Sequence, residues 1–185
     1  MPEVFVSVGS NIEPGKNVRR ALLLLNEQIN IIATSTFYLT APLGKFRQPL
    51  FFNGVIKVAT EIPPLELKMS VLRKIEALLG RERTQNRFAP RPIDLDLIIY
   101  GGLVIRENGL SIPDPEIYER PFLGLPLLEL SPRLVMPDSG IPLTQVVAGL
   151  DGNCMVPLQD YTAALRKELA NEPGESGKAH SRIAC

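Results

Sequence analysis

Histidine, tryptophan and cysteine are scarce in this chain of 185 residues. It has no tryptophan, two cysteines and one histidine, His180, which stands in a polar stretch near the C-terminus. The expected folded body therefore lacks a Ser-His-Asp or Cys-His nucleophile system, an imidazole base and the usual histidine ligands of zinc. If the chain is an enzyme, then carboxylates, arginines, backbone amides or a bound metal must perform its chemistry.

An excess of charge and long apolar runs are also missing. Lys and Arg total 20, and so do Asp and Glu, so no overall charge attracts the chain to nucleic acid or to an acidic membrane. No segment approaches the roughly 20 apolar residues of a membrane span, and the N-terminus lacks a secretory pattern. Cys154 and Cys185 have neither a disulfide nor a metal-binding spacing. We expect a cytoplasmic monomer with small-molecule partners, no nucleic acid and no membrane.

Hydrophobic periodicity predicts an α+β fold. Two segments with apolar residues at helical spacing begin at Lys16 and near Pro64. The segments with strand character are 3–8, 31–39, 53–60 and 93–100. The resulting order, βαββαβ, is that of the ferredoxin-like fold, an antiparallel sheet with both helices on one face. The other face of the sheet would then be left for function.

Two connections of this fold, 40–52 and 80–92, are too long to be simple turns. Long loops in a compact domain are usually functional or disordered, and both of these flank the same sheet. A hairpin, a proline-bounded helix near 121–129 and further short helices are expected to follow the last strand. These later elements form a C-terminal helical extension of the core.

The composition also predicts how the chain is divided. We expect one folded domain over 1–160 and a C-terminal extension over 161–185. From about Glu168 the composition is that of a linker, which predicts a largely disordered tail.

The segment from Gly9 to Lys16 follows a strand and opens a helix, as a phosphate-binding P-loop does. It does not fit that motif, because five residues separate Gly9 from Gly15 where Walker A has four, and Asn17 follows Lys16 where Ser or Thr is needed. The chain order also lacks the parallel βαβ units of such folds. We interpret Gly9 as permitting a tight strand exit and Asn17 as helping to start the helix.

Asp94 and Asp96 give the first indication of a site. Residues two apart on a strand point the same way, so these carboxylates share one face about 6.5–7 Å apart. The aliphatic residues of the segment share the other face and would pack on the helices: Ile93, Leu95, Leu97 and Ile99. Two like charges beside an apolar run need a cation or an arginine to neutralise them. On its own, Asp-x-Asp is more typical of two solvated carboxylates.

The preceding loop favours a functional reading, because four arginines fall within eleven residues: Arg81, Arg83, Arg87 and Arg91. Carboxylates bind Mg²⁺, which bridges phosphates, and arginines hold the remaining phosphate oxygens in bidentate fashion. Phosphoryl-type transfer needs little else, since positioning and charge neutralisation do most of the work. The alternative is that these arginines solvate an exposed loop or form salt bridges with Glu82, Asp94 and Asp96.

The segment Arg87-Phe-Ala-Pro-Arg-Pro-Ile-Asp-Leu-Asp96 resembles the signature of the 6-hydroxymethyl-7,8-dihydropterin pyrophosphokinase (HPPK) family. Further stretches that resemble the family stand in the right order over residues 3–140: Val8-Gly9-Ser10-Asn11, Phe37 to Gly44, Gln48 to Asn53 and Arg120 to Leu127. The resemblance implies a ferredoxin-like fold with inserted loops. It also implies transfer of pyrophosphate from ATP to the pterin hydroxymethyl oxygen in folate biosynthesis, giving AMP and the pterin diphosphate.

The resemblance implies roles for individual residues on the ATP side. Asp94 and Asp96 would hold two Mg²⁺ ions between the ATP phosphates and the acceptor hydroxyl, and Arg81 and Arg91 would engage phosphate when the 80–92 loop closes. These four are the expected catalytic residues. The expected ATP-binding residues are Glu76, Arg83, Arg87 and Arg120. For Glu76, a helix carboxylate paired with Arg73 or Arg83 remains an alternative.

On the pterin side, the resemblance implies a sandwich of aromatic rings and a reader of the heterocycle's edge. Phe51 and Phe122 would sandwich the pterin, and Phe88 would cover it. Asn53 and the backbone around Thr40 and Leu43 would read its hydrogen-bonding edge. This fits a flat polar ring, which needs apolar faces and a few directed edge contacts. Without the resemblance, Phe51 and Phe122 read as core residues.

The chain departs from the family pattern at several positions. The family usually reads Pro-His-Pro-Arg where this chain has Pro113-Asp114-Pro115-Glu116, so a phosphate-side histidine is replaced by an acid. Phe88 stands where an indole or phenol is often found, and Ala41 replaces a frequent proline. ATP contact by Asp114 is therefore not carried over.

Other functions remain open at this point, because ferredoxin-like sheets also serve as RNA-binding and small-molecule regulatory modules. An RNA-recognition motif would carry aromatics on two central strands, which segment 53–60 lacks. A regulatory module would not need Asp-x-Asp with four loop arginines. A non-catalytic binder, or a nucleotide-dependent kinase with another acceptor, is the alternative to a pyrophosphokinase.

Overall fold

A computed structural model describes residues 1–42, 48–82 and 89–171 of the chain. Its main sheet is antiparallel and has the order β5-β1-β4-β3-β8, with β2 also paired to β4. These strands are β1 (Val4–Ser10), β2 (Asn30–Thr34), β3 (Tyr38–Thr40), β4 (Phe51–Ala59), β5 (Asp94–Tyr100) and β8 (Val156–Pro157). A separate hairpin consists of β6 (Ile105–Glu107) and β7 (Leu110–Ile112). The expected mixed α/β architecture with an antiparallel sheet is confirmed.

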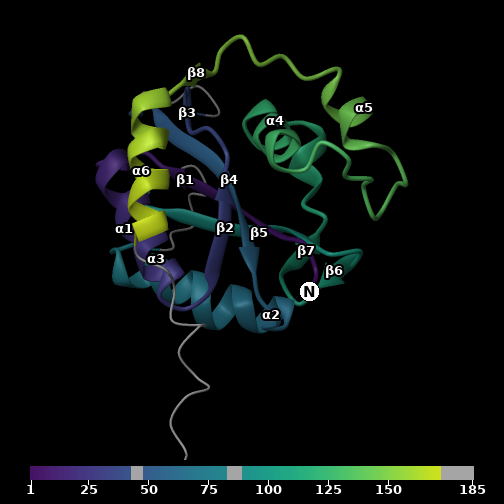
Figure 1. The fold of residues 1–185 in the computed structure, drawn as a ribbon, viewed down its shortest axis with the longest axis horizontal. Coiled ribbons are helices and arrows are strands. Elements are labelled where there is room, and N and C mark those ends of the chain that lie inside the picture. The colour runs from purple at the N-terminus through teal and green to yellow at the C-terminus, as the bar shows by residue number, and fades with distance from the viewer. Residues whose placement is uncertain (43–47, 83–88, 172–185) are drawn as a thin grey trace, which may run out of the picture.

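The helices pack on both faces of this sheet (Figure 1). They are α1 (Pro14–Asn26), α2 (Pro64–Glu66), α3 (Arg73–Leu78), α4 (Pro121–Leu130), α5 (Leu143–Val147) and α6 (Gln159–Asn171), with the π-helix η1 (Leu67–Leu72) and the 3₁₀-helix η2 (Pro115–Tyr118). The segments α2, η1 and α3 follow one another without a break. Gly80 ends this stretch with φ +83°, a left-handed conformation that favours glycine.

Two hydrophobic cores lie on opposite faces of the sheet. The first joins α1, η1, α3 and α6 to one face, through residues such as Val6, Leu22 and Ile75. The second joins α4 and α5 to the other face, through residues such as Phe5 and Leu127. The expectation of helices on one face only was therefore wrong. Because the second core covers only part of its face, the remainder, at the start of β5, is left for side chains such as Asp94.

The register of β5 against β1 explains why the alternation of β5 changes along its length. Val6 pairs with Leu97 and Phe5 pairs with Ile99, so Ile98 is an extra residue in the ladder. Ile98 and Ile99 consequently both pack in the second core. The expectation that Ile99 shares the helix-covered face with Leu95 and Leu97 was wrong for this reason, while Leu95 and Leu97 do pack in the first core.

The segment expected as one strand over 31–39 is divided into β2 and β3, both of which pair with β4. Between them, Ser35 keeps the chain attached to β4, because its N donates to Val55 O at 2.8 Å and its Oγ accepts from Val55 N at 2.9 Å. The break between β2 and β3 therefore does not detach the chain from β4.

The C-terminal part of the described chain is more ordered than its composition predicts. Helix α6 buries Leu165 and Leu169 in the first core, and Arg166 Nη2 donates to Thr34 O at 2.6 Å. The boundary expected at 160/161 falls inside this helix, and residues 161–171 are helical where a largely disordered extension was expected. Residues 172–185 lie outside the described part. None of the described helices is both long and apolar enough to cross a membrane.

Candidate active site

The sheet register brings the polar residues of three strands together. Gly9 of β1 pairs with Asp94 of β5 on one side and with Asn53 of β4 on the other. Ser7, two residues back along β1, pairs with Asp96. Since residues two apart share a face, Asp94 and Asp96 lie on the same side of the sheet, as the sequence predicted. Both carboxylates are partly exposed there.

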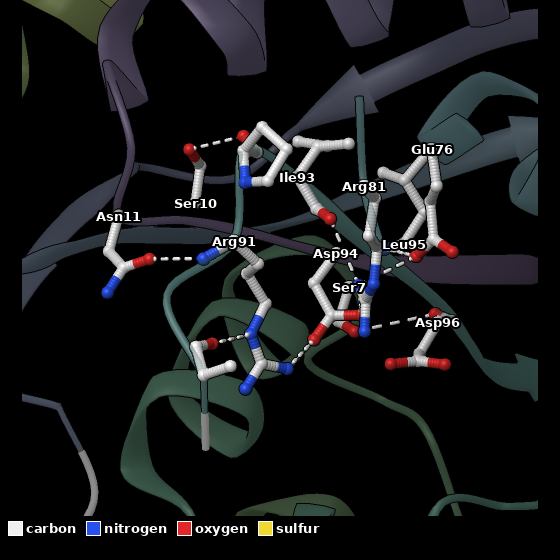
Figure 2. Close-up of polar contacts among 12 residues, drawn as sticks. Ser7, Ser10, Asn11, Glu76, Arg81, Arg91, Ile93, Asp94, Leu95 and Asp96 are labelled. Atoms are coloured by element: carbon white, nitrogen blue, oxygen red, sulfur yellow. Dashed lines mark hydrogen bonds and ion pairs between the residues drawn. The ribbon is translucent and has the colours of Figure 1, made fainter. Parts of the chain in front are cut away.

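Asp94 is held by two arginines from the segment that precedes β5 (Figure 2). Its Oδ1 accepts a hydrogen bond from Arg81 Nη1, and its Oδ2 accepts one from Arg91 Nη1. The Arg81 guanidinium also donates to Ile93 O at 3.0 Å. The predicted meeting of loop arginines with a strand carboxylate therefore occurs, and it corresponds to the salt-bridged alternative of the sequence analysis.

Glu76 supports this arrangement from within the protein. Its side chain is 2% exposed, and its Oε1 accepts from Arg81 Nη1 at 2.9 Å and from Leu95 N at 2.9 Å. Burial on its own would lower the pKa of Arg81, but Asp94, Glu76 and Asp96 raise it above its usual value, so the guanidinium remains charged. Glu76 was expected at the edge of a nucleotide pocket, with Arg73 or Arg83 as alternative partners. The structure instead places it under Arg81.

Asn11 fixes the position of Arg91, a role that the sequence analysis did not assign. Its Oδ1 accepts from Arg91 N at 2.7 Å, and its backbone N donates to Arg91 O at 3.2 Å. Its Nδ2 donates to Gln48 Oε1 at 3.3 Å. Nearby, Ser10 Oγ donates to Pro92 O at 2.6 Å. The family resemblance of the stretch Val8-Gly9-Ser10-Asn11 was the one feature of the sequence from which a role for Asn11 could have been predicted.

Asp96 has a different environment from Asp94. Burial and the charge of Asp94 raise its pKa to about 7, while Lys68 acts in the opposite direction. The Lys68 ammonium is 3.7 Å from Asp96 Oδ1, an ion pair longer than a hydrogen bond. Among the residues that the structure describes, Asp96 therefore lacks the close cationic partners that Asp94 has. A carboxylate of this kind gains from binding a cation.

A pocket with an empty volume of about 590 Å³ opens beside these carboxylates. Its lining residues are Gly9, Ala41, Pro42, Gln48, Phe51, Asn53, Arg91, Asp94, Glu116 and Phe122. The Arg91 guanidinium lies 5.9 Å from the centre of the Phe51 ring. Phe51 and Phe122 thus line a pocket, which favours their predicted ligand-facing role over the core alternative. Gln48 and Glu116 are lining residues that the sequence analysis did not name as part of the site.

The side chain of Asn53 lies close to the backbone of Gly9 in this pocket. Asn53 Nδ2 donates to Thr40 Oγ1 at 2.7 Å, which fixes the carboxamide and leaves Oδ1 on the side of β1. A Cβ atom at position 9 would lie 2.8 Å from Asn53 Oδ1. Gly9 lies within β1, so the interpretation that it permits a tight strand exit was wrong. It is needed because the Asn53 carboxamide approaches the backbone.

An adjoining pocket shares Asp94, Glu116 and Phe122 with the first and is lined in addition by Asp96 and Asp114. Asp114 Oδ1 accepts from Glu116 N at 2.8 Å and so caps η2. Burial raises the pKa of Asp114, and the charge of Glu116 adds to this, against the backbone hydrogen bond and the charges of Lys68 and Arg106. The position where the family pattern has histidine therefore carries a carboxyl group that faces the site.

The remaining predicted site residues are only partly accounted for. Arg120 precedes α4, and its Nε is 3.8 Å from Glu116 Oε2, next to the pockets. Thr40 is buried and contributes its hydroxyl to Asn53. Leu43, Arg83, Arg87 and Phe88 lie outside the described residues.

The donor atoms at this site fit a hard cation. Among the residues that the structure describes, no cluster of three or more His, Cys, Asp or Glu side chains is arranged to hold a metal ion. Asp94 and Asp96 supply carboxylate oxygens from one face of the sheet, and Asp114 and Glu116 line the same pocket. This suits Mg²⁺, which typically binds proteins through one or two carboxylates and takes its other ligands from water and substrate phosphates.

Comparisons with known proteins point to one family. The family model described as 7,8-dihydro-6-hydroxymethylpterin-pyrophosphokinase (HPPK) matches residues 5–132. A 2-amino-4-hydroxy-6-hydroxymethyldihydropteridine pyrophosphokinase of Haemophilus influenzae is 35% identical over 161 residues, which cover 85% of this chain and 99% of that protein. A protein of the same name from Pseudomonas aeruginosa is 36% identical over 138 residues, covering 73% of this chain and 84% of its own length.

Longer proteins also contain a matching part. The folate synthesis bifunctional protein of Arabidopsis thaliana is 40% identical over 130 residues, 69% of this chain and 27% of that protein. The crystal structure of Plasmodium falciparum HPPK-DHPS, wild type with SDX-DHP, superposes with a TM-score of 0.61 at 16% identity, covering 95% of this chain and 46% of that one. At that identity the likeness concerns the fold. The chain spans less than half of these bifunctional proteins.

Proposed function

The chain belongs to the 7,8-dihydro-6-hydroxymethylpterin-pyrophosphokinase family, and we propose how its residues perform that family's reaction. The reaction is the transfer of pyrophosphate from ATP to 6-hydroxymethyl-7,8-dihydropterin in folate biosynthesis, with AMP and the pterin diphosphate as products. The single observation that carries the proposal is the placement of Asp94 and Asp96 on one face of β5, with Arg81 and Arg91 on Asp94, beside a pocket lined by two phenylalanines.

Asp94 and Asp96 would hold two Mg²⁺ ions. When bound, these ions would neutralise the ATP phosphates and align the β-phosphorus with the acceptor hydroxyl. Asp96 is available for this because its only described close cation is 3.7 Å away. Asp94 has both oxygens bound to arginines, and we propose that at least one arginine leaves it when the substrates arrive.

Arg81 and Arg91 are suited to such an exchange of partners. Each guanidinium has five N–H donors, of which Asp94 uses one, so a phosphate oxygen can replace the carboxylate without loss of charge pairing. Glu76 keeps Arg81 at the site during the exchange, and Asn11 does the same for the backbone of Arg91. We propose that both arginines hold the transferred phosphates, and that Arg83, Arg87 and Arg120 bind the rest of ATP.

The pterin would lie in the pocket between Phe51 and Phe122. Support comes from their positions in the lining and from Asn53, whose carboxamide is fixed by Thr40. A fixed amide offers one donor edge and one acceptor to a heterocycle, which gives orientation at a small entropic cost. Leu43 and Phe88 are proposed to complete this site.

The proposal is tested by identifying the nucleotide product. The protein is incubated with ATP, Mg²⁺ and 6-hydroxymethyl-7,8-dihydropterin, and AMP and ADP are separated by chromatography. We expect AMP, formed only when both the metal and the pterin are present. ADP would mean transfer of a single phosphoryl group, and AMP without pterin would mean hydrolysis; either result contradicts the proposal.

We also propose a ferredoxin-like topology for the core, with β2 and β3 together as its second strand. The order β5-β1-β4 followed by β2 or β3 supports this. A catalytic domain over 1–160, a monomeric state and a cytoplasmic location remain proposals. A sedimentation measurement at micromolar concentration tests the monomer, because a dimer would double the mass of 20.4 kDa.

A further inference from the structure

Lys68 contacts the site from the helical stretch that runs from α2 to α3, and it has no role in the reaction proposed above. Its Nζ is 3.7 Å from Asp96 Oδ1 and donates a hydrogen bond of 3.0 Å to Gly109 O. The side chain is 16% exposed. It belongs to η1, a π-helical turn, and such turns are frequent at functional sites because they re-aim side chains within a helix.

The charges around Lys68 explain why a cation stands at this position. Asp96 and Asp114 both line the adjoining pocket, and the Lys68 charge stabilises the ionised form of each. Arg81 and Arg91 are engaged with Asp94. Lys68 thus offsets the negative charge in the part of the site that the two arginines do not contact. This part includes position 114, where the family pattern has a histidine and this chain has an acid.

The geometry of the ammonium group permits a change of partner. It has three protons, of which one is held by Gly109 O at the turn between β6 and β7. The contact with Asp96 is an ion pair without a direct hydrogen bond, since 3.7 Å exceeds hydrogen-bond distance. The anchor on Gly109 therefore does not depend on Asp96, and the ammonium can lose the carboxylate without leaving the pocket.

We propose that Lys68 exchanges partners during the reaction: it balances Asp96 in the free enzyme and passes to an ATP phosphate oxygen when Asp96 binds Mg²⁺. The inference rests on the proposed function, because it requires the metal at Asp96. A metal ion on Asp96 and the Lys68 ammonium repel each other, while the triphosphate that arrives with the metal attracts both. Lys68 therefore opposes metal binding without nucleotide and favours the two together.

The test uses calorimetric titration of the full chain and two titrants. Mg²⁺ is titrated first without nucleotide, and α,β-methylene ATP is then titrated at saturating Mg²⁺. For Lys68→Met we expect Mg²⁺ alone to bind about tenfold tighter, and the nucleotide analogue to bind about tenfold more weakly, as for one lost charge-assisted contact. Lys68→Arg keeps the charge and should recover most of the analogue affinity.

Lys74→Met is the matched control, because Lys74 is an exposed lysine of the same helical stretch. It should bind Mg²⁺ and the analogue like the unmodified chain. Circular dichroism melting establishes that each variant is folded. If Lys68→Met is not folded, the same titrations are made with Lys68→Gln, which removes the charge but retains a donor for Gly109 O.

Each part of the inference can fail on its own. If Lys68→Met binds Mg²⁺ alone no more tightly than the unmodified chain does, Lys68 does not compete for Asp96, and the partner exchange is wrong. If its affinity for the analogue is unchanged, Lys68 does not contact phosphate, and the exchange is again wrong. Failure of the proposed function looks different: the unmodified chain itself would bind no Mg²⁺ in the presence of the analogue.

Discussion

The buried carboxylate of Glu76 forms an ion pair with Arg81, with 2.9 Å between Glu76 Oε1 and Arg81 Nη1. The same carboxylate oxygen accepts from the backbone N of Leu95, inside the strand that carries Asp94 and Asp96. One buried acid therefore sets the position of an arginine and of the strand next to it.

Glu76→Gln should lower both stability and turnover. The amide can still accept from Leu95 N, but it removes one of the two carboxylates that pair with Arg81, which costs about 1.5–3 kcal/mol of unfolding free energy. Urea titration measures the loss, and Glu66→Gln, at an exposed position of α2, is the control. An unchanged unfolding midpoint would show that the pair adds nothing to the fold.

Asp96→Asn should abolish most of the turnover while sparing pterin binding without metal. The substitution removes a metal ligand, and a loss of several kcal/mol of transition-state stabilisation corresponds to a decrease of about 100-fold or more in kcat. AMP formation and pterin fluorescence quenching provide the two measurements. Asp160→Asn, at an exposed position of α6, should behave as the unmodified chain. Near-normal turnover in Asp96→Asn would contradict the metal assignment.

The stability of the metal-free protein should fall as pH rises through the range in which Asp96 ionises. Its folded-state pKa is about 7, against 3.8 for the ordinary carboxyl, so between these values the folded state binds the extra proton. Stability from this group is thus present below about pH 4 and is lost as pH rises through 7.

Mg²⁺ should reverse that loss, because it binds the ionised form. We expect the rise in melting temperature on adding Mg²⁺ to be larger at pH 8 than at pH 5.5, and Asp96→Asn to show no such difference. Differential scanning calorimetry at both pH values measures this. A Mg²⁺ effect that is equal at the two pH values would mean that Asp96 does not bind the ion.

Asp114→Asn should raise the affinity for ATP about two- to fivefold. The amide keeps an oxygen that can accept from Glu116 N, so η2 stays capped, but a negative charge is removed from a pocket that Asp96 also lines. Asp114→Ala removes the cap too and should cost about 1 kcal/mol of stability. Glu119→Gln, a nearby exposed position, is the control. A sharp fall in turnover of Asp114→Asn would instead assign Asp114 a metal-binding role.

Gly9→Ala should weaken pterin binding and leave ATP binding unchanged. The added methyl would lie 2.8 Å from Asn53 Oδ1, so the carboxamide must move and lose its alignment with Thr40. We expect the KM for the pterin to rise about tenfold, the size of one lost hydrogen bond to a substrate. Gly102→Ala, where no atom lies within 4 Å, is the control. An unaltered KM would show that Asn53 does not contact the pterin.

The sequence predicted the common face of Asp94 and Asp96 correctly because a strand has a period of two over that stretch. The same rule failed at Ile99, because one additional residue in the ladder, Ile98, reverses the faces. No glycine or proline stands next to Ile98 in the sequence to indicate this irregularity. Local alternation is thus reliable only as far as the next irregularity in pairing.

Other parts of the site depend on contacts far apart in the chain. Glu76 stands within an apolar helical stripe, four residues after Leu72 and three before Leu79, and this position was a usable signal that it is buried. Lys68 and Gln48 gave no such signal, because their roles arise from neighbours that only the folded chain supplies. Likewise, the linker-like composition after Glu168 did not reveal that Leu169 packs in the first core.

Helix α6 packs in the layer of α1 and α3, on the side of the sheet away from α4 (Figure 1). The pocket lined by Asp94, Asn53 and Phe122 lies on the α4 side. A reporter or a second catalytic module fused after Asn171 would therefore depart from the back of the molecule. It would leave the pocket lined by Asp94, Asn53 and Phe122 unobstructed, so immobilisation through that end should preserve access to the proposed substrate site.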